Sequence, residues 1–214
     1  MPAENIFGVE AASETELREL VPPPAQLVLD KVLDHADAHI RHFIRICPYA
    51  MIATTDSNGV CDASPRGGAP GFIQILDDRH LLIVELPGNR RADSLCNLLE
   101  TPSIGMLLLV PGYYETLRIN GKAVITRDEA ILSRYANGGA RPVVGIGITI
   151  AECYIHCAKA SLRSSLWNPI DWPDLAGVPT AAEMLRDHTK AAFGDGSVDQ
   201  MEDVLHESYL KRLR

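Results

Sequence analysis

The sequence has 214 residues, of which 46% are hydrophobic and 22% are charged, a composition typical of a folded globular protein. This length suits one ordinary domain or one domain with extensions. The formal net charge of −8 argues against nonspecific binding to nucleic acid or to anionic membranes, but it does not argue against one local basic site.

Targeting and redox signals point to the cytoplasm. The N-terminal residues lack the continuous apolar run of a signal peptide, and the longest apolar runs, such as residues 106–110, are far too short to span a bilayer. The five cysteines are odd in number and scattered in position. We therefore expect free thiols, a cytoplasmic location and no membrane partner.

The N-terminal part of the chain is expected to be an arm followed by a helix. Residues 1–24 look like a loose arm that ends at a run of prolines. From residue 25 to residue 46 apolar side chains recur at helical spacing, and Pro48 follows them. The spacing predicts one helix over residues 25–46.

The hydrophobic period then changes to that of strands. Most of the connections are too short for a parallel crossover, so the sheet should be mostly antiparallel and closed as a barrel without free edges. We predict a mainly β fold with six or more strands, six of them in the barrel, an N-terminal helix, a central helix over residues 89–100, a short helix over residues 128–137 and C-terminal helices. The strand segments are 49–56, 60–64, 72–78, 80–86, 103–110, 115–128 and 143–159, and residues 65–71 are expected to be a loop.

Two arginines stand at the start of the predicted central helix. Asn89 is well placed to cap this helix, so Arg90 and Arg91 would occupy its first two positions, where cations are disfavoured. Backbone N–H groups and two guanidinium groups at a helix N-terminus suit a phosphate. Two interpretations stay open at this point, namely a phosphate site and a solvated pair neutralised by Asp93.

Two further segments also allow a functional and an ordinary interpretation. The Gly/Pro-rich segment 63–72 carries one arginine, and it is either a site of close approach to a ligand or a simple turn. In the strand over residues 115–121, Thr116, Arg118 and Asn120 share one face. That polar row faces either a ligand or solvent.

The segment after the last strand, residues 159–169, combines cations with a tryptophan. Arg163 and Trp167 either cover a flat aromatic ligand or belong to a segment that packs on the barrel. The two interpretations are equally supported by the residues themselves.

Two groups of residues resemble metal sites on paper. His35, His39 and His42 share one face of the predicted helix, but no carboxylate or thiolate lies on that face. In residues 153–157, His156 would point away from the two cysteines if the segment is a strand. We therefore expect buried thiols and no metal.

Six motifs follow one another in the order found in a known family. They are ATTDSNG (53–59), SPRG (64–67), GNRRADSLCN (88–97), LVPG (109–112), ETLRINGKA (115–123) and HCAKASLRSSLWNP (156–169). Together they resemble the pyridoxamine 5'-phosphate oxidase-like family of FMN-binding split barrels, and the resemblance covers roughly residues 25–170. The match is closest to a bacterial branch of FMN-dependent enzymes without an assigned substrate.

The resemblance implies an antiparallel split β-barrel over residues 25–170, a homodimer with FMN at the subunit interface, and flavin-dependent oxidoreductase activity. We expect residues 171–214 to form a helical extension that packs on the barrel. The implied cofactor-binding residues are Ser64, Arg66, Phe72, Glu85, Asn89, Arg90, Arg91, Ser94, Thr116, Arg118, Arg163 and Trp167.

The sequence also departs from the family pattern. It lacks the basic, ring-contacting strand and the C-terminal Trp…His-Arg motif of true pyridoxamine phosphate oxidases, which argues against that substrate. Asparagine is more usual at the position of Arg90, so Arg91 is the favoured phosphate ligand. The alternatives are a non-catalytic flavin-binding or sensory protein and a haem-binding split barrel, because one fold hosts several functions.

Overall fold

The computed structural model describes residues 6–86, 88–135, 142–193 and 196–212. Contacts within the chain divide it into two compact units, Met1–Val32 and Leu33–Arg214, and each unit is treated by itself. Among the described residues, no helix is both long and apolar enough to cross a membrane.

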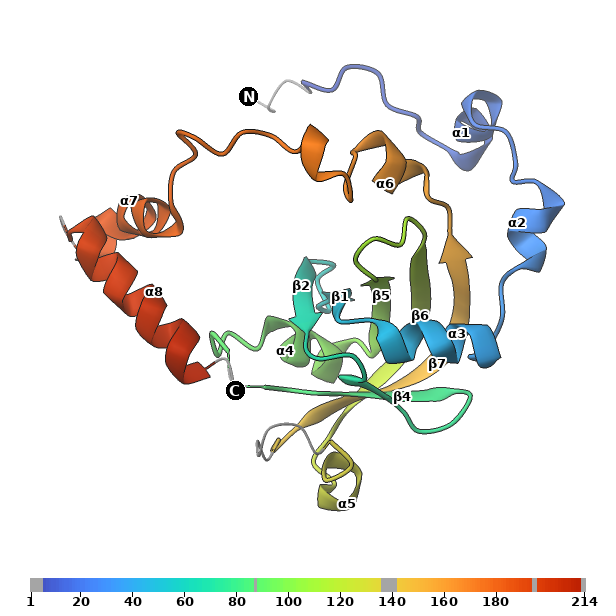
Figure 1. Cartoon of the computed structure of the whole chain (residues 1–214). Helices are drawn as coiled ribbons and strands as arrows, with labels where there is room; N and C mark the ends of the chain where they lie inside the picture. Colours follow the sequence, from blue (N-terminus) through green and yellow to red (C-terminus); the bar gives the residue numbers. More distant parts are fainter. Residues whose placement is uncertain (1–5, 87, 136–141, 194–195, 213–214) are drawn as a thin grey trace. The chain divides into compact units, whose positions relative to one another are not determined.

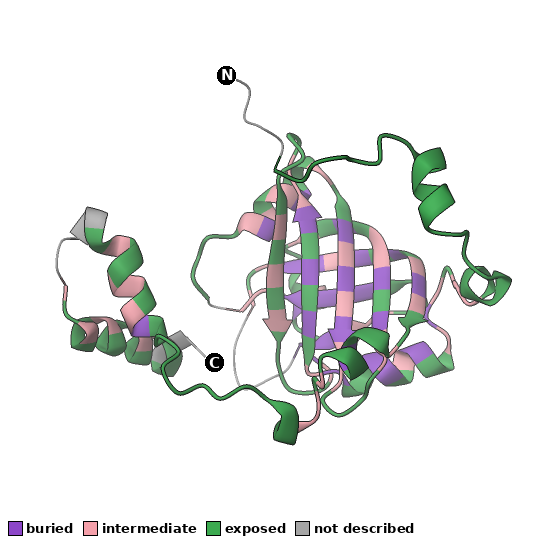
Figure 2. Ribbon diagram, turned by 90° about the horizontal axis from the view of Figure 1, so that it is seen from above, coloured by how far each residue is buried: buried purple, intermediate pink, exposed green. Residues whose placement is uncertain are grey.

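The N-terminal unit contains two short helices, α1 (Glu14–Leu20) and α2 (Gln26–Asp30), and its residues 6–30 are exposed (Figure 2). Ser13 caps α1 by accepting a hydrogen bond from the backbone N–H of Glu16 at 3.2 Å. The arm expected over residues 1–24 thus includes one helix.

The single helix predicted over residues 25–46 is wrong, because the chain forms α2 and α3 (Ala38–Ile46) with a break between them. The backbone of Leu33 exchanges two hydrogen bonds with Cys153, of 3.0 and 2.7 Å. Asp37 then caps α3 by accepting a hydrogen bond from the N–H of Ile40 at 2.8 Å. The apolar spacing therefore continues across a segment that pairs with a distant strand.

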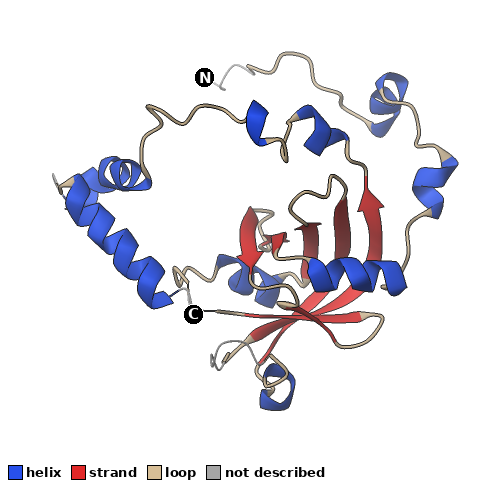
Figure 3. Cartoon of the chain, in the orientation of Figure 1, coloured by secondary structure: helices blue, strands red, loops and turns tan. Residues whose placement is uncertain are grey.

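Seven antiparallel strands form one sheet in the second unit, so the antiparallel prediction is confirmed and the sheet has one strand more than the six expected in the barrel (Figures 1 and 3). The strands are β1 (Tyr49–Thr55), β2 (Cys61–Gly67), β3 (Ile73–Ile75), β4 (His80–Val84), β5 (Ser103–Leu109), β6 (Thr116–Thr126) and β7 (Gly145–His156). Their order is β2-β1-β5-β6-β7-β4-β3.

The sheet curls without closing. In Figure 1, β4 runs across the direction of β5 and β6, so the sheet forms a half-barrel. Among the described strands no ladder joins β2 to β3, and these two strands are the edges of the sheet. The fold is therefore a split barrel, and the expectation that closure removes every edge is wrong.

Buried and exposed side chains alternate along the strands, and the buried ones form the core. In β1, Ala50, Ile52 and Thr54 are buried, whereas Tyr49 and Met51 between them are exposed. The inward faces of β4 to β7 add a dense set of buried leucines and isoleucines, and α3 and α4 (Asp93–Glu100) contribute to the same core (Figure 2). The inner face of the sheet is thus apolar wherever a helix or a facing strand covers it.

Several boundaries differ from the predicted ones. β2 continues through Pro65 to Gly67, where a loop was expected, and β3 is shorter than segment 72–78. The short helix expected over 128–137 is α5 (Glu129–Leu132), and residues 136 and 137 lie outside the described part of the chain.

The C-terminal segments are helical, as expected. After β7 come α6 (Lys159–Arg163) and a 3-10 turn, η1 (Pro169–Asp171). Helices α7 (Ala181–Phe193) and α8 (Val198–Arg212) then pack against each other. Packing of this pair on the barrel stays a prediction.

A β-bulge fixes the bend of β6 against β7. The pairing register shifts between Asn120 and Gly121, and a β-carbon at Gly121 would collide with the carbonyl oxygen of Thr149. The bend therefore requires a glycine at this position, because the neighbouring strand approaches its backbone too closely for any side chain.

We expect Gly121→Ala to lower the free energy of unfolding by about 1–3 kcal/mol, because the added carbon forces two backbones apart. Urea denaturation followed by circular dichroism measures this change. Gly147→Ala is the matched control, since its β-carbon would lie 3.4 Å from Val124 Cγ2, an ordinary contact. Equal stabilities of the two variants would contradict the prediction.

Candidate functional site

A cavity of about 340 Å³ opens where β2 meets the residues that follow β4. Its lining includes five of the residues expected to bind a cofactor: Ser64, Arg66, Phe72, Glu85 and Asn89. A volume of this size lies within the range of small-molecule sites. These five residues come from three segments, namely β2, the residue before β3 and the residues after β4, which the fold brings together.

The register of β2 on β1 explains why two polar side chains enter this cavity. Ser64 pairs with Ile52 and Arg66 pairs with Ala50. Directly paired residues of an antiparallel ladder point to the same face, and both β1 residues are buried in the core. Ser64 and Arg66 therefore project from an edge strand toward the inner side of the sheet.

Arg66 is the centre of a small polar network. Its Nη1 donates to Ser64 Oγ at 2.6 Å and to the carbonyl oxygen of Pro65 at 2.9 Å. Its Nη2 lies 3.4 Å from Glu85 Oε2 in an ion pair, and the arginine side chain is 16% exposed. Arg66 Nε and Glu85 Oε2 are both buried, and neither has a hydrogen-bond partner among the described residues.

Apolar side chains form the walls around this pair. Phe72, Ile83 and Val84 are nearly fully buried and line the cavity together with Leu86. Tyr135 also lines it, and sequence reasoning missed this residue. It follows α5 with no motif of its own, so nothing in the local sequence relates it to β2.

The two arginines of the GNRRADSL segment do not begin a helix, which corrects the predicted start at Asn89. Arg90 and Ala92 have φ values of 62° and 57°, in the left-handed region, so helical backbone begins only at Asp93. The Asn89 side chain instead accepts a hydrogen bond from the N–H of Arg91 at 3.0 Å. The arginines lie before the helix, in an irregular turn.

Asp93 neutralises Arg91. Arg91 Nε donates to Asp93 Oδ2 at 2.7 Å, and this hydrogen bond raises the pKa of the Arg91 guanidinium. The side chain of Arg91 is 73% exposed and does not line the cavity. Arg90 makes no ion pair with any residue the structure describes. Of the two interpretations of these arginines, the solvated one with Asp93 as the neutralising partner describes Arg91. The charge of Arg90 is not neutralised in this way.

Ser94 faces the β1–β2 hairpin and does not line the cavity. Its hydroxyl donates to Asp62 Oδ2 at 2.6 Å, and one turn later Asn97 Nδ2 donates to Thr54 Oγ1 at 3.2 Å. Ser94 is 3% exposed. These two bonds hold α4 on the hairpin that carries Arg66.

Thr116 and Arg118 lie on the other face of the sheet from Ser64 and Arg66. Arg118 pairs with Leu107, which pairs with Met51, a residue that alternates with the buried positions of β1. The Arg118 Nη1 donates to Tyr154 Oη at 3.1 Å. A polar row thus runs along the outer face of β6 and β7, away from the cavity.

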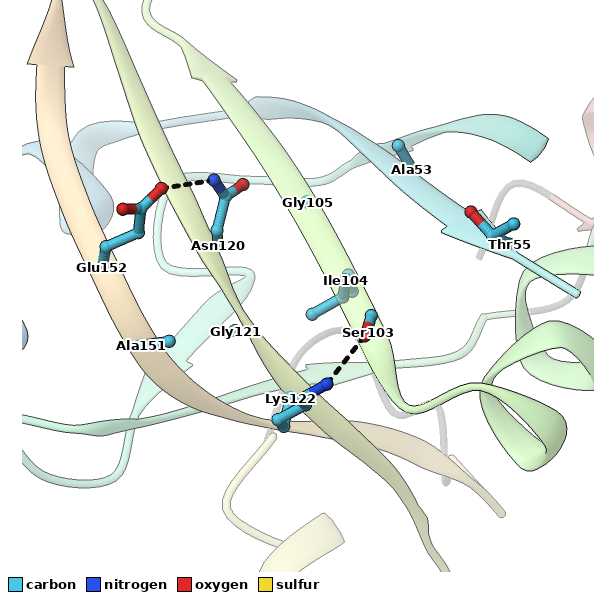
Figure 4. A pocket seen from close by; sticks show the side chains of 10 residues that line it. All are labelled: Ala53, Thr55, Ser103, Ile104, Gly105, Asn120, Gly121, Lys122, Ala151 and Glu152. Carbon is cyan, nitrogen blue, oxygen red and sulfur yellow. Dashed lines mark hydrogen bonds between the residues drawn. The ribbon is translucent and has the colours of Figure 1, made fainter. Parts of the chain in front are cut away.

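A shallow hollow of about 520 Å³ lies on this same outer face (Figure 4). Two small residues, Ala53 and Gly105, are among those that line it. Two cross-strand hydrogen bonds flank it, from Asn120 Nδ2 to Glu152 Oε1 at 2.7 Å and from Lys122 Nζ to Ser103 Oγ at 2.8 Å.

Arg163 and Trp167 also lie outside the cavity. Arg163 Nε donates to the carbonyl oxygen of Lys159 at 3.1 Å, within α6. Trp167 Nε1 donates to the carbonyl oxygen of Tyr113 at 2.9 Å, which ties the late segment to the β5–β6 connection. The Trp167 indole N–H therefore makes a contact within the protein, as expected if the late segment packs on the barrel.

The groups that resemble metal sites are taken apart by the fold. His35 lies before α3, and its Nδ1 is 2.9 Å from Asp34 Oδ1, an interaction that with Arg79 holds the pKa of Asp34 below its usual range. Cys153 is buried, and its Sγ donates to the carbonyl oxygen of His35 at 3.1 Å. Within the described ranges, no three such side chains come close enough to bind a metal.

Comparisons with known proteins agree with this architecture. A family model for pyridoxamine 5'-phosphate oxidase matches residues 36–157, more than half of the chain. No curated protein matches the chain significantly.

Solved structures with similar folds share little sequence with the chain. HupZ of Group A Streptococcus has a TM-score of 0.46 and 17% identity over 56% of this chain and 92% of its own. General Stress Protein 26 of Bacillus anthracis has a TM-score of 0.41 and 15% identity over 55% and 93%. The heme storage protein HutZ of Vibrio cholerae has a TM-score of 0.42 and 10% identity over 56% and 94%.

The burial of the cysteines predicts which thiols react. Burial raises the pKa of Cys47, and burial together with nearby carboxylates raises that of Cys153 to about 11. At pH 8 the thiolate fraction of Cys153 is then on the order of 10⁻³. Cys61, Cys96 and Cys157 are exposed, so the expectation of buried thiols in residues 153–157 is confirmed for Cys153 and wrong for Cys157.

We therefore expect Ellman's reagent at pH 8 to modify three thiols of the native protein rapidly and all five in guanidinium chloride. Cys96→Ser should remove one rapid thiol, and mass spectrometry of peptides identifies the others. Rapid modification of Cys47 or Cys153 in the native state would refute this assignment.

Proposed function

Because the chain belongs to the pyridoxamine 5'-phosphate oxidase family, we propose that its cavity binds FMN and that the protein is a flavin-dependent oxidoreductase. The observation that carries this proposal is the partly buried Arg66–Glu85 pair, in which one buried donor, Arg66 Nε, and one buried acceptor, Glu85 Oε2, have no hydrogen-bond partner among the described residues. Such groups are costly unless a ligand completes their hydrogen bonds.

The residues present fit a flavin. Phe72, Val84 and Leu86 offer apolar walls for a ring system, and Arg66 and Glu85 offer polar contacts at its edge. Asn89 lines the cavity, and Arg90, which follows it in the sequence but does not line the cavity, is the cation we propose for the phosphate. When bound, FMN supplies the redox chemistry, and the protein binds it, orients it and shapes the substrate cleft.

We further propose a homodimer with FMN at the interface. Thr116 and Arg118 lie on the opposite face of the sheet from Ser64 and Arg66, so one chain cannot direct both sets at one cofactor. A second copy can supply the outer face, together with Arg163 and Trp167. The free state of all five cysteines fits the cytoplasm as the location of this dimer.

The visible spectrum of purified, FMN-reconstituted protein tests the cofactor. We expect flavin bands near roughly 370 and 450 nm. A Soret band with no flavin bands would refute FMN binding.

Arg66→Ala should weaken FMN binding at least tenfold, about 1.4 kcal/mol, because it removes a buried charged donor. Arg79→Ala, a surface control, should bind FMN like the wild type.

Two further measurements test activity and assembly. Reduced nicotinamide with oxygen as the acceptor should be turned over, and the absence of turnover with any donor would favour a non-catalytic flavin protein.

Light scattering should give twice the chain mass of 23.4 kDa. A monomer that retains FMN would refute the interfacial site.

A further inference from the structure

The unpaired atoms of the cavity specify what a ligand must present to them. Arg66 Nε is a donor, and Glu85 Oε2 is an acceptor that already lies 3.4 Å from Arg66 Nη2. A ligand satisfies both when it carries an acceptor directly beside a donor. A simple anion satisfies the arginine alone and leaves the carboxylate without a proton donor.

Charge also argues against a phosphate at this position. The Glu85 carboxylate balances the Arg66 guanidinium, so a phosphate dianion placed here would be repelled by Glu85. Asn89 lines the same cavity but is exposed, and the following Arg90 has no ion pair among the described residues. Arg90 does not line the cavity but follows Asn89 directly, so we assign the phosphate to this exposed end of the cavity, and the Arg66–Glu85 pair is left for another part of the ligand.

The walls beside the pair favour a planar ring. Glu85 stands between Val84 and Leu86 in the sequence, and both of these line the cavity with Phe72. Val84 and Phe72 are almost completely buried. The polar pair thus lies next to apolar side chains within a cavity of mixed lining, which suits the polar edge of a ring system better than a solvated polyol chain.

We propose that Arg66 and Glu85 recognise the imide edge of the flavin ring, an inference that rests on the proposed binding of FMN. The N3–H of the ring donates to Glu85 Oε2, and an adjacent ring carbonyl accepts from Arg66 Nε. The pair therefore determines which end of the cofactor enters the cavity first, and Glu85 is a residue that selects ligands with an imide N–H.

Binding of FMN and of 3-methyl-FMN to the wild-type apoprotein, measured by fluorescence quenching, tests this assignment. The methyl group removes the N3 proton and leaves the phosphate unchanged. We expect 3-methyl-FMN to bind at least tenfold more weakly. Riboflavin and 3-methylriboflavin should show the same ratio at lower affinity, because the imide and the phosphate are held by different residues.

Two variants then assign the effect to Glu85. Glu85→Ala should bind FMN and 3-methyl-FMN with nearly equal affinity, whereas Glu85→Gln should retain most of the preference for FMN, since its amide oxygen still accepts from N3–H. Circular dichroism confirms that each variant is folded. Equal binding of the two flavins by the wild type would overturn the inference while leaving FMN binding intact. Failure of the wild type to bind any flavin would overturn the proposed function itself.

Discussion

The ladder between β1 and β2 is the constraint on which the site depends. β2 is an edge strand, so its inward-facing side chains are not enclosed by a further strand, yet they follow the register of a buried neighbour. An apolar residue at the position of Arg66 would extend the core, whereas the arginine makes this stretch of the inner face a polar cavity. Pro65 has no N–H to offer another strand, which also protects the open edge from aggregation.

The segment before α4 shows how the chain accommodates two cations near a helix N-terminus. Left-handed backbone at Arg90 and Ala92 delays the helix until Asp93, an acidic residue that the helix dipole favours in its first turn. The same Asp93 pairs with Arg91, so the positive charge next to the helix is neutralised locally. Arg90 remains as the cation whose position is not explained by contacts within the described protein. The pairing of Arg91, and not of Arg90, with Asp93 depends on backbone conformation, which residue type alone does not encode.

Local patterns predicted most of the sheet. The alternation of Ala50, Ile52 and Thr54 with exposed neighbours is strong enough to locate β1, and comparable patterns located β5, β6 and β7. The break in the N-terminal helix could not be predicted, because it arises from hydrogen bonds between Leu33 and Cys153, far apart in the sequence. The predicted start of the central helix was wrong for a related reason, since left-handed φ values at an arginine and an alanine have no sequence signature. The Tyr135 side chain enters the cavity through tertiary packing alone.

The candidate cofactor-binding residues lie on two opposite faces of the sheet, which the order of the motifs along the sequence does not show. SPRG and ETLRING both look like ligand-binding strands, but the register directs Arg66 and Arg118 to opposite faces of the sheet. Within one chain these faces cannot meet at a single ligand, because the apolar core lies behind one of them. If both motifs act on the same cofactor, the second face must come from another molecule. The shallow outer hollow, whose lining includes the small residues Ala53 and Gly105, then becomes a surface where a second backbone can approach closely. The separation of the two motifs across the sheet is thus itself a physical argument for a site built from two chains.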